Sequence, residues 1–342
     1  MRSLFSFFTQ QRQRTPQVML TVSFAALPGL IALCWIYGPG SLIQTCIAAT
    51  TALLAEAVIL KLRHRPIGRT LLDGSAFLTA LLIAVALPPY APWWIAVIAS
   101  LSAMILGKHL YGGLGQNPFN PAMVGYVVVL ISFPLAMTQW PVPHSVSVVD
   151  ALRQIFGFAQ LPDGWSQATA LDLVKNNRSL TLEELWKVPA FGHLGGIGSE
   201  IVNLAFLAGG LFLLHKRLIS WQAPIGMLLG LGVMALLFWN SGSSDTHGSP
   251  LFHWLTGATM LGAFFIVTDP VTGATSPRGR LIFGLGVGAL VYIIRVWGGY
   301  PDGVAFAVLL MNLCAPTIDF YSRPRTFGHA KARQGHKGSQ HE

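Results

Sequence analysis

Long apolar segments almost free of charge are the feature that most constrains how this chain can fold. Val18–Tyr37 and Met123–Thr138 contain no Asp, Glu, Lys or Arg, and Ser41–Leu60 contains only Glu56. A bilayer is crossed by a helix of roughly 20 apolar residues, so segments of this kind are typical of membrane spans. Only 10% of the 342 residues are charged, against about 25% in a soluble domain. The sequence therefore predicts a multi-pass membrane protein.

The apolar pattern predicts an all-α fold of about ten spans, several of them short. They cover residues 17–37, 41–60, 75–88, 92–107, 122–139, 197–215, 223–239, 251–267, 281–297 and 302–320. Gly, Pro and Asn interrupt apolar sequence near Pro88–Pro89, Asn117–Pro121 and Asp269–Pro270. Such interruptions indicate broken or re-entrant helices, which membranes accept only where protein or a cavity satisfies the freed backbone groups.

Basic residues gather in short clusters, and their distribution predicts the orientation of the chain. With the N-terminus in the cytoplasm, 17 of the 22 basic residues lie on that side: Arg2, Arg12, Arg14, Lys61, Arg63, Arg65, Arg69, Lys108, Lys216, Arg217, Arg278, Arg280, Arg323, Arg325, Lys331, Arg333 and Lys337. The others are Arg153, Lys175, Arg178 and Lys187, which lie outside, and the interfacial Arg295. Because cytoplasmic loops are enriched in Lys and Arg, we expect a bacterial inner-membrane protein with both termini in the cytoplasm. The net charge of +9 thus indicates topology and not nucleic-acid binding.

This orientation divides the chain into five parts. Residues 1–16 form a cytoplasmic N-terminus, 17–139 a first five-helix half, 140–196 an extracytoplasmic loop, 197–320 a second five-helix half, and 321–342 a basic cytoplasmic tail. The halves share landmarks in the same order. Gly112–Gly113 and Gly298–Gly299 each follow an aromatic residue, and Ser75–Pro89 runs parallel to Thr256–Pro270. An odd number of spans per half would make the two repeats inverted, although membrane helices of similar composition also produce such matches by chance.

Residues that bind metals or nucleotides show no recognisable pattern. Cys34, Cys46 and Cys314 form no Cys-x-x-Cys pair, and the ten histidines show no spacing of four suited to a metal. A dinucleotide-binding glycine pattern is absent as well. We expect neither a metal site nor a complete active site on this chain.

The predicted outer loop contains Asp163-Gly164-Trp165-Ser166-Gln167-Ala168-Thr169. By its residues alone this is a turn followed by a segment with hydroxyl side chains, and an ordinary polar loop is the simpler interpretation.

Two long segments resemble the D subunits of Rnf electron-transport complexes. They are residues 107–123 (GKHLYGGLGQNPFNPAM) and 298–310 (GGYPDGVAFAVLL), and the resemblance runs almost from end to end. The B subunits of sodium-pumping NADH:quinone oxidoreductases share this fold but usually have a longer N-terminal extension, so the chain is more similar to the Rnf family.

The resemblance implies a role and a set of partners. Rnf complexes couple electron transfer between ferredoxin and NAD to ion translocation, and this chain would be a membrane electron relay within one. Its partners would be membrane iron–sulfur subunits, a second FMN-carrying subunit, and subunits that bind NADH and ferredoxin. A different possibility is a solute transporter or channel built on inverted repeats, without a redox role.

The resemblance also implies covalent FMN, joined through its phosphate to a threonine in a Ser-x-Ala-Thr type motif. Ser166-Gln167-Ala168-Thr169 matches, with Gln167 where glycine is usual. Two other segments, Thr256–Thr259 and Thr272–Thr275, have the sequence Thr-Gly-Ala-Thr and so match the common Ser/Thr-Gly-Ala-Thr form more closely. However, the family's flavin transferase works outside the cytoplasm, whereas Thr259 lies within a span and Thr275 lies inside, so we expect FMN on Thr169.

Four further interpretations concern residues in or near the membrane. Trp165 either covers the flavin ring or anchors the loop at the interface. Asn117 and Asn120 suit either a broken helix that binds a second, noncovalent flavin such as riboflavin, or a plain loop. Glu56, alone in an early span, belongs either to an ion path or to a structural pair. Asp302 and Asp319 flank the last span and Asp269 ends the eighth; they serve either ions or helix capping.

Overall fold

The apolar segments form helices in a computed structural model that describes residues 15–144, 146–158, 164–177, 180–239, 247–300 and 302–322. The first half contains α2 (Thr15–Tyr37), α3 (Gly40–Leu62), α4 (Ile67–Leu71), α5 (Ser75–Ala86), α6 (Trp93–Ser102), the π-helix η1 (Ala103–His109), α7 (Pro121–Ser132) and α8 (Pro134–Thr138). The second half contains α12 (Ser199–His215), α13 (Gln222–Leu237), α14 (Pro250–Leu255), α15 (Thr259–Leu261), the π-helix η2 (Gly262–Ile266), α16 (Pro277–Trp297) and α17 (Val304–Ser322).

The loop between the halves has its own small elements. The strands β1 (Trp140–Pro141) and β2 (Ser166–Gln167) pair antiparallel, with Trp140 opposite Gln167. Between them lies α9 (Val148–Phe156), and after them come α10 (Ala170–Asn176) and α11 (Leu182–Leu185). The predicted loop is therefore a folded cap rather than a plain connection.

Helix length and composition confirm a multi-pass membrane protein. Among the described residues, α2, α3, α16 and α17 have 19 to 23 residues and are long and apolar enough to cross a bilayer. Shorter apolar helices cover Ser75–Ala86, Trp93–His109, Pro121–Ser132, Ser199–His215 and Gln222–Leu237. The large apolar side chains on the outside of α2 and α3, such as Leu54 at 67% exposed, are those expected against lipid.

Each predicted interruption lies between helices: Pro88–Pro89 between α5 and α6, Asn117–Pro121 between η1 and the body of α7, and Asp269–Pro270 between η2 and α16. Two predicted spans are also divided, which the sequence did not predict. The span expected at 251–267 consists of α14, α15 and η2, because Thr256 leaves the helical conformation and Gly257 has a left-handed backbone with φ of +58°. The span expected at 122–139 ends at Ser132, and α8 follows after Phe133. The segments before Asn117–Pro121 and Asp269–Pro270 are both π-helices, η1 and η2, a form common at functional sites.

The two halves lie side by side and contact each other mainly through α2 and α12, with a second contact between α7 and α17. Glycines permit the first contact. A Cβ on Gly29 would lie 2.2 Å from the Phe206 ring, and one on Gly209 would lie 1.9 Å from the carbonyl oxygen of Ala25. Small residues of this kind let membrane helices approach closely.

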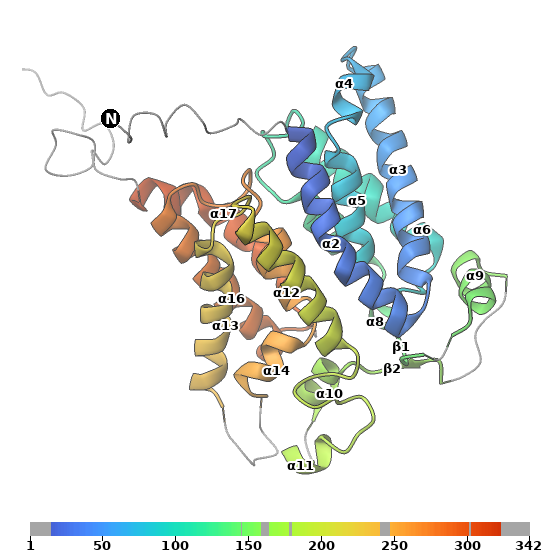
Figure 1. Cartoon of the computed structure of the whole chain (residues 1–342), viewed down its shortest axis with the longest axis vertical. Helices are drawn as coiled ribbons and strands as arrows, with labels where there is room; N and C mark the ends of the chain where they lie inside the picture. The colour runs from blue at the N-terminus through green and yellow to red at the C-terminus, as the bar shows by residue number, and fades with distance from the viewer. Residues whose placement is uncertain are drawn as a thin grey trace, which may run out of the picture.

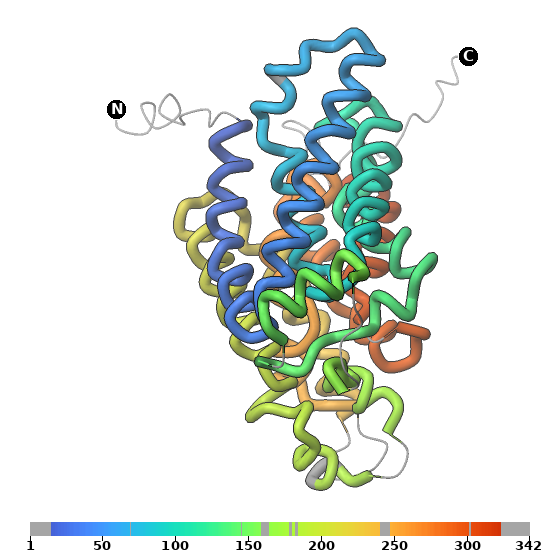
Figure 2. Tube along the Cα trace, turned by 90° about the vertical axis from the view of Figure 1, so that its right-hand side faces the viewer, coloured from blue at the N-terminus to red at the C-terminus, as the bar shows by residue number. Residues whose placement is uncertain are grey.

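The molecule has two distinct ends. The described chain begins and finishes toward the same end as α4, which we call the terminal end; α10 and α11 lie at the other, the loop end (Figure 1, Figure 2). Exposed tryptophans mark the loop end: Trp35, Trp93, Trp239 and Trp297. Exposed Tyr111, Trp221 and Tyr321 mark the terminal end. Aromatic residues at both ends of an apolar belt are typical of the two membrane–water interfaces.

Candidate flavin cavity and buried polar clusters

An open cavity of about 1400 Å³, counting its solvent-filled mouth, lies between the two halves under the folded loop. The first half contributes apolar and aromatic side chains, including Tyr37, Met123 and Tyr126. The second half contributes Asn203, Phe206 and Asp302, and the loop contributes Trp140 and Thr169. A mainly apolar pocket with a few convergent polar groups is typical of cofactor sites.

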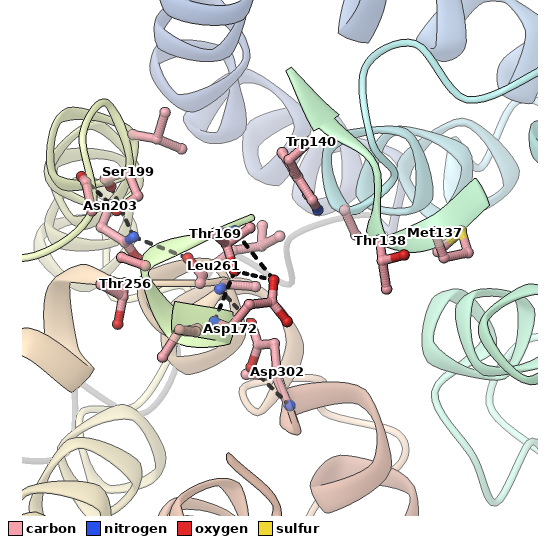
Figure 3. Close-up of a pocket in the computed structure, with 18 of the residues that line it drawn as sticks. Met137, Thr138, Trp140, Thr169, Asp172, Ser199, Asn203, Thr256, Leu261 and Asp302 are labelled. Carbon is pink, nitrogen blue, oxygen red and sulfur yellow. Dashed lines mark hydrogen bonds between the residues drawn. The ribbon is translucent and has the colours of Figure 1, made fainter. Parts of the chain in front are cut away.

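Thr169 is held at this cavity by helix capping. It is the N-cap of α10, where Asp172 N–H donates to Thr169 Oγ1 over 3.2 Å and Thr169 N–H donates to Asp172 Oδ2 over 3.2 Å. Thr169 Oγ1 also donates to Asp172 Oδ2 over 2.6 Å (Figure 3). A reciprocal capping box fixes the chain direction at a helix start, so it fixes the position of this hydroxyl as well.

Strand pairing and a half-buried lysine secure the rest of the segment. Gln167 and Ala168 line the cavity, and Gln167 and Ser166 form β2 opposite β1. On α10, Lys175 Nζ donates to the carbonyl oxygen of Tyr300 over 2.7 Å, and burial lowers the pKa of Lys175. The loop is thereby fastened to the first half through β1 and to the second half through α10.

Tryptophan positions differ from the expectation for the flavin ring. Trp165 does not line the cavity; its ring packs edge-on against Tyr90 at 6.2 Å, beside Ala151 and Ile155 of α9. The indole at the cavity belongs to Trp140 (Figure 3). The sequence offered no sign of this, because Trp140 reaches the site only through the pairing of β1 with β2. Asp163 lies outside the described residues.

Asp302 belongs to the cavity wall and is fastened there. Its Oδ1 lies 3.1 Å from Nη2 of Arg295, a residue expected at the interface but buried in the structure. Arg295 also donates to the carbonyl oxygen of His253 and to Thr259 Oγ1, each over 2.8 Å. Asp302 Oδ2 accepts from Ala258 N–H over 2.7 Å. The pair therefore holds together the break between α14 and α15.

The two alternative threonine motifs have different surroundings. Thr259 is completely buried, and its hydroxyl donates to the carbonyl oxygens of His253 and Thr256. Thr275 lies next to α16 and its Oγ1 donates to Asp319 over 3.0 Å, while Thr275 N–H donates to the same carboxylate over 2.8 Å. Asp319 thus acts as a cap for the segment before α16. Of Thr169, Thr259 and Thr275, the last residues of the three motifs, Thr169 alone lines the cavity.

A second polar cluster joins the halves where the π-helices end. Asn120 caps α7, accepting from Ala122 N–H over 3.0 Å, and its Nδ2 lies 3.4 Å from Asp269 Oδ2. Asp269 also accepts from Val271 N–H and Thr272 Oγ1 over 3.0 Å each. Asn117 Oδ1 and Asn312 Oδ1 are buried without a hydrogen-bond partner among the described residues. Buried acceptors left unpaired are costly, so this cluster suits a ligand that donates hydrogen bonds.

Glu56 lies in a third cluster, completely buried between α3, α5 and η1. Its Oε1 forms an ion pair with Lys108 and lies 3.3 Å from His109 Nε2, while Lys108 Nζ also donates to Ser75 Oγ over 2.7 Å. Glu56 Oε2 has no hydrogen-bond partner within the described part of the chain. Lys108, expected at the cytoplasmic surface as a topology determinant, is instead 1% exposed, which corrects its assignment. Lys108 and His109 are the functional candidates that sequence reasoning missed.

Comparison with known proteins identifies the family of this chain. A model of the NQR2, RnfD, RnfE family matches residues 4–328. The chain belongs to this family. It is 66% identical over 325 residues to the D subunit of the ion-translocating oxidoreductase complex of Ectopseudomonas mendocina (strain ymp), covering 95% of each chain. The protein of the same name from Cellvibrio japonicus (strain Ueda107) is 52% identical over 336 residues, with 95% of this chain and 94% of the relative covered.

A more distant relative carries the same name. The D subunit of the ion-translocating oxidoreductase complex of Escherichia coli O1:K1 / APEC is 50% identical over 343 residues, covering 95% of this chain and 97% of the relative. The resemblance to D subunits of Rnf complexes is thereby confirmed, and it extends over nearly the whole chain.

Proposed function

We propose that this chain is the D subunit of an Rnf-type ion-translocating oxidoreductase complex and relays electrons through FMN bound to Thr169. The observation that carries the proposal is the hydroxyl of Thr169, held by a capping box at the edge of the cavity between the halves. When bound, FMN supplies one- and two-electron transfer, and the protein supplies its orientation and surroundings.

The residues present fit a flavin. Trp140, Tyr37, Tyr126 and Phe206 offer aromatic and apolar surface for a ring system, and Asp302 offers an acceptor at the wall. A phosphoester to Thr169 Oγ1 would tether the cofactor at one edge and leave its ring free to enter the cavity. In such an ester Thr169 Oγ1 carries no proton, so it could no longer donate to Asp172 Oδ2.

We further propose that the fold consists of ten crossings in two inverted five-helix repeats. Helix contacts support this: α2 and α12, the first helix of each half, contact each other, as do α7 and α17, which would be the last crossing of each half. The loop end would face outward from a bacterial inner membrane, with both termini in the cytoplasm, as the basic residues predict.

The polar cluster of Asn117, Asn120, Asp269 and Asn312 is proposed as the site of a second, noncovalent flavin such as riboflavin. Its unpaired Asn117 and Asn312 acceptors suit the donors of an isoalloxazine or ribityl group. A relay with one flavin near each end of the molecule would carry electrons across the membrane in two steps.

The ion path is proposed to include Glu56. Burying a carboxylate in the membrane with one oxygen unpaired costs stability, and such costly residues are functional candidates by default. The contacts of Asp302 with Arg295 and of Asp319 with Thr275 favour structural roles for these two carboxylates. The partners would be the membrane iron–sulfur subunits, the second FMN-carrying subunit, and the subunits that bind NADH and ferredoxin.

In-gel fluorescence tests the proposal. The chain is expressed with the family's flavin transferase, separated on a denaturing gel, and viewed under ultraviolet light. The wild type is expected to fluoresce, Thr169→Ala to be dark, and Thr275→Ala to fluoresce. A dark wild-type band would contradict the covalent attachment of FMN and favour a transporter or channel without a redox role. A fluorescent Thr169→Ala band with a dark Thr275→Ala band would move the site to Thr275.

A further inference from the structure

Helix α9 carries an apolar face that no part of the described chain covers. Ala151 and Ile155 are buried against Ile43 and Ile47 of α3, so one side of the helix is accounted for. Five other apolar side chains on α9 and just after it are at least 41% exposed: Val148, Val149, Leu152, Phe156 and Phe158. Singly exposed apolar residues are ordinary, but a group of five on a short segment is not.

The four of these residues that lie on α9 itself form one continuous stripe. At about 100° per residue, Val148, Leu152, Phe156 and Val149 fall within roughly a quarter-turn that begins directly beside the buried face of Ala151 and Ile155. Asp150, Arg153 and Gln154 occupy the remaining side, and Arg153 Nη1 lies 3.8 Å from Asp150 Oδ1 there. The circumference of α9 therefore has three parts: a face packed against the protein, an exposed apolar face next to it, and a polar face.

The position of α9 in the fold indicates the environment of the exposed stripe. Ile43 and Ile47 lie in the first two turns of α3, and Tyr90 and Trp165 complete the same small core. This is the level of the loop end at which exposed Trp35 and Trp93 mark the edge of the apolar belt. In Figure 1 α9 lies beside the lower end of α3, and in Figure 2 it runs across α3 rather than along it.

We infer that α9 is an interfacial helix that lies in the outer headgroup region and inserts Val148, Val149, Leu152 and Phe156 into the acyl boundary. The occupant is lipid, because the stripe continues onto the lipid-facing surface of α3, where Leu42 and Leu54 are more than half exposed. A helix with an apolar face and a polar face that lies across the spans has the form of such interfacial helices.

The inference has a structural consequence for the site. The loop leaves β1, passes through α9 and returns to β2, the strand next to Thr169. Anchoring α9 to the bilayer surface would fix the height of that strand pair, and hence of Thr169, relative to the membrane.

Spin-label accessibility in the assembled complex, reconstituted into lipid nanodiscs, tests this. Single cysteines are placed at Val149, Leu152, Phe156, Asp150, Arg153 and Gln154 after Cys34, Cys46 and Cys314 have been replaced by alanine. Each label's collisions with apolar oxygen and with a polar nickel chelate are compared by power saturation. Leu54→Cys serves as the lipid reference and Lys187→Cys, exposed on the loop, as the aqueous reference.

The expected result is a periodic pattern: oxygen-rich values near that of Leu54→Cys at positions 149, 152 and 156, and chelate-rich values near that of Lys187→Cys at 150, 153 and 154. Two results would overturn the inference. Chelate-rich values along the whole helix would mean that the stripe faces water. Low accessibility to both reagents at 149, 152 and 156 would mean that a neighbouring protein of the complex covers it.

Discussion

At the residue scale, Thr169 has two roles to separate, as a helix cap and as the proposed attachment point. Thr169→Ala removes the capping oxygen and should destabilise α10 by about 1 kcal/mol, besides abolishing the covalent flavin. Thr169→Ser keeps a hydroxyl oxygen that can accept from Asp172 N–H and should retain the cap. Hydrogen exchange of the α10 amides, measured in both variants, checks the capping effect.

The capping loss must not be mistaken for the loss of flavin. Asp172→Asn leaves the Thr169 hydroxyl in place but weakens the reciprocal box, so its α10 amides should exchange faster while the gel band still fluoresces. A dark band for Asp172→Asn would mean that an ordered α10 start, or the carboxylate itself, is needed for attachment.

The buried ion pair of Glu56 and Lys108 is best tested by comparing a variant that removes one charge with a variant that removes both. Glu56→Gln leaves the Lys108 charge buried without its partner, and breaking a buried pair in this way costs about 3–5 kcal/mol. The double variant Glu56→Gln/Lys108→Met removes both charges and should recover much of that loss. Thermal unfolding of the purified protein in detergent measures the difference.

Ion pumping then separates structure from transport. If Glu56 belongs to the ion path, pumping by the complex in vesicles should be impaired in Glu56→Gln and stay impaired in the double variant, while the Thr169 flavin remains bound. Pumping restored along with stability in the double variant would return Glu56 to a purely structural role.

At the element scale, the α2–α12 contact depends on the absence of side chains. Gly209→Ala would place a Cβ 1.9 Å from the carbonyl oxygen of Ala25, so the two helices would have to separate, at a cost of about 1–3 kcal/mol. Gly68→Ala is the matched control, because a Cβ there meets nothing within 4 Å. We expect a lower midpoint of thermal unfolding for Gly209→Ala and no lowering for Gly68→Ala; equal midpoints would show that α2 and α12 are not tightly packed.

The elements themselves were predictable wherever the signal is local. Apolar composition over 17–37 and 41–60 predicted α2 and α3 nearly to the residue, because a helix that crosses the bilayer must be predominantly apolar along its whole length. The span at 251–267 was predicted as one helix but has three pieces, since Gly257 adopts a left-handed conformation that composition does not reveal. The Gly, Pro and Asn interruptions did indicate non-helical stretches, because residues 110–120 follow η1 and residues 267–276 follow η2.

The site was predictable only in part, for a physical reason. Thr169 could be proposed from its motif and from topology, both of which are written in the sequence. Its neighbours could not: Trp140 reaches the cavity through strand pairing, and Lys108 reaches Glu56 across 52 positions of the chain. A lysine at the edge of an apolar segment looks like a topology determinant, and only packing shows that its charge is buried.

At the scale of the whole molecule, the decisive question is which end faces out. Attachment of FMN to Thr169 requires the loop end to be extracytoplasmic, and the basic residues predict the same. In a background without Cys34, Cys46 and Cys314, Lys187→Cys on the loop and Lys216→Cys after α12 lie at opposite ends of the fold. A membrane-impermeant maleimide should label Lys187→Cys in intact spheroplasts and label Lys216→Cys only after the membrane is opened. The reverse pattern would contradict the orientation and, with it, the choice of Thr169 over Thr275.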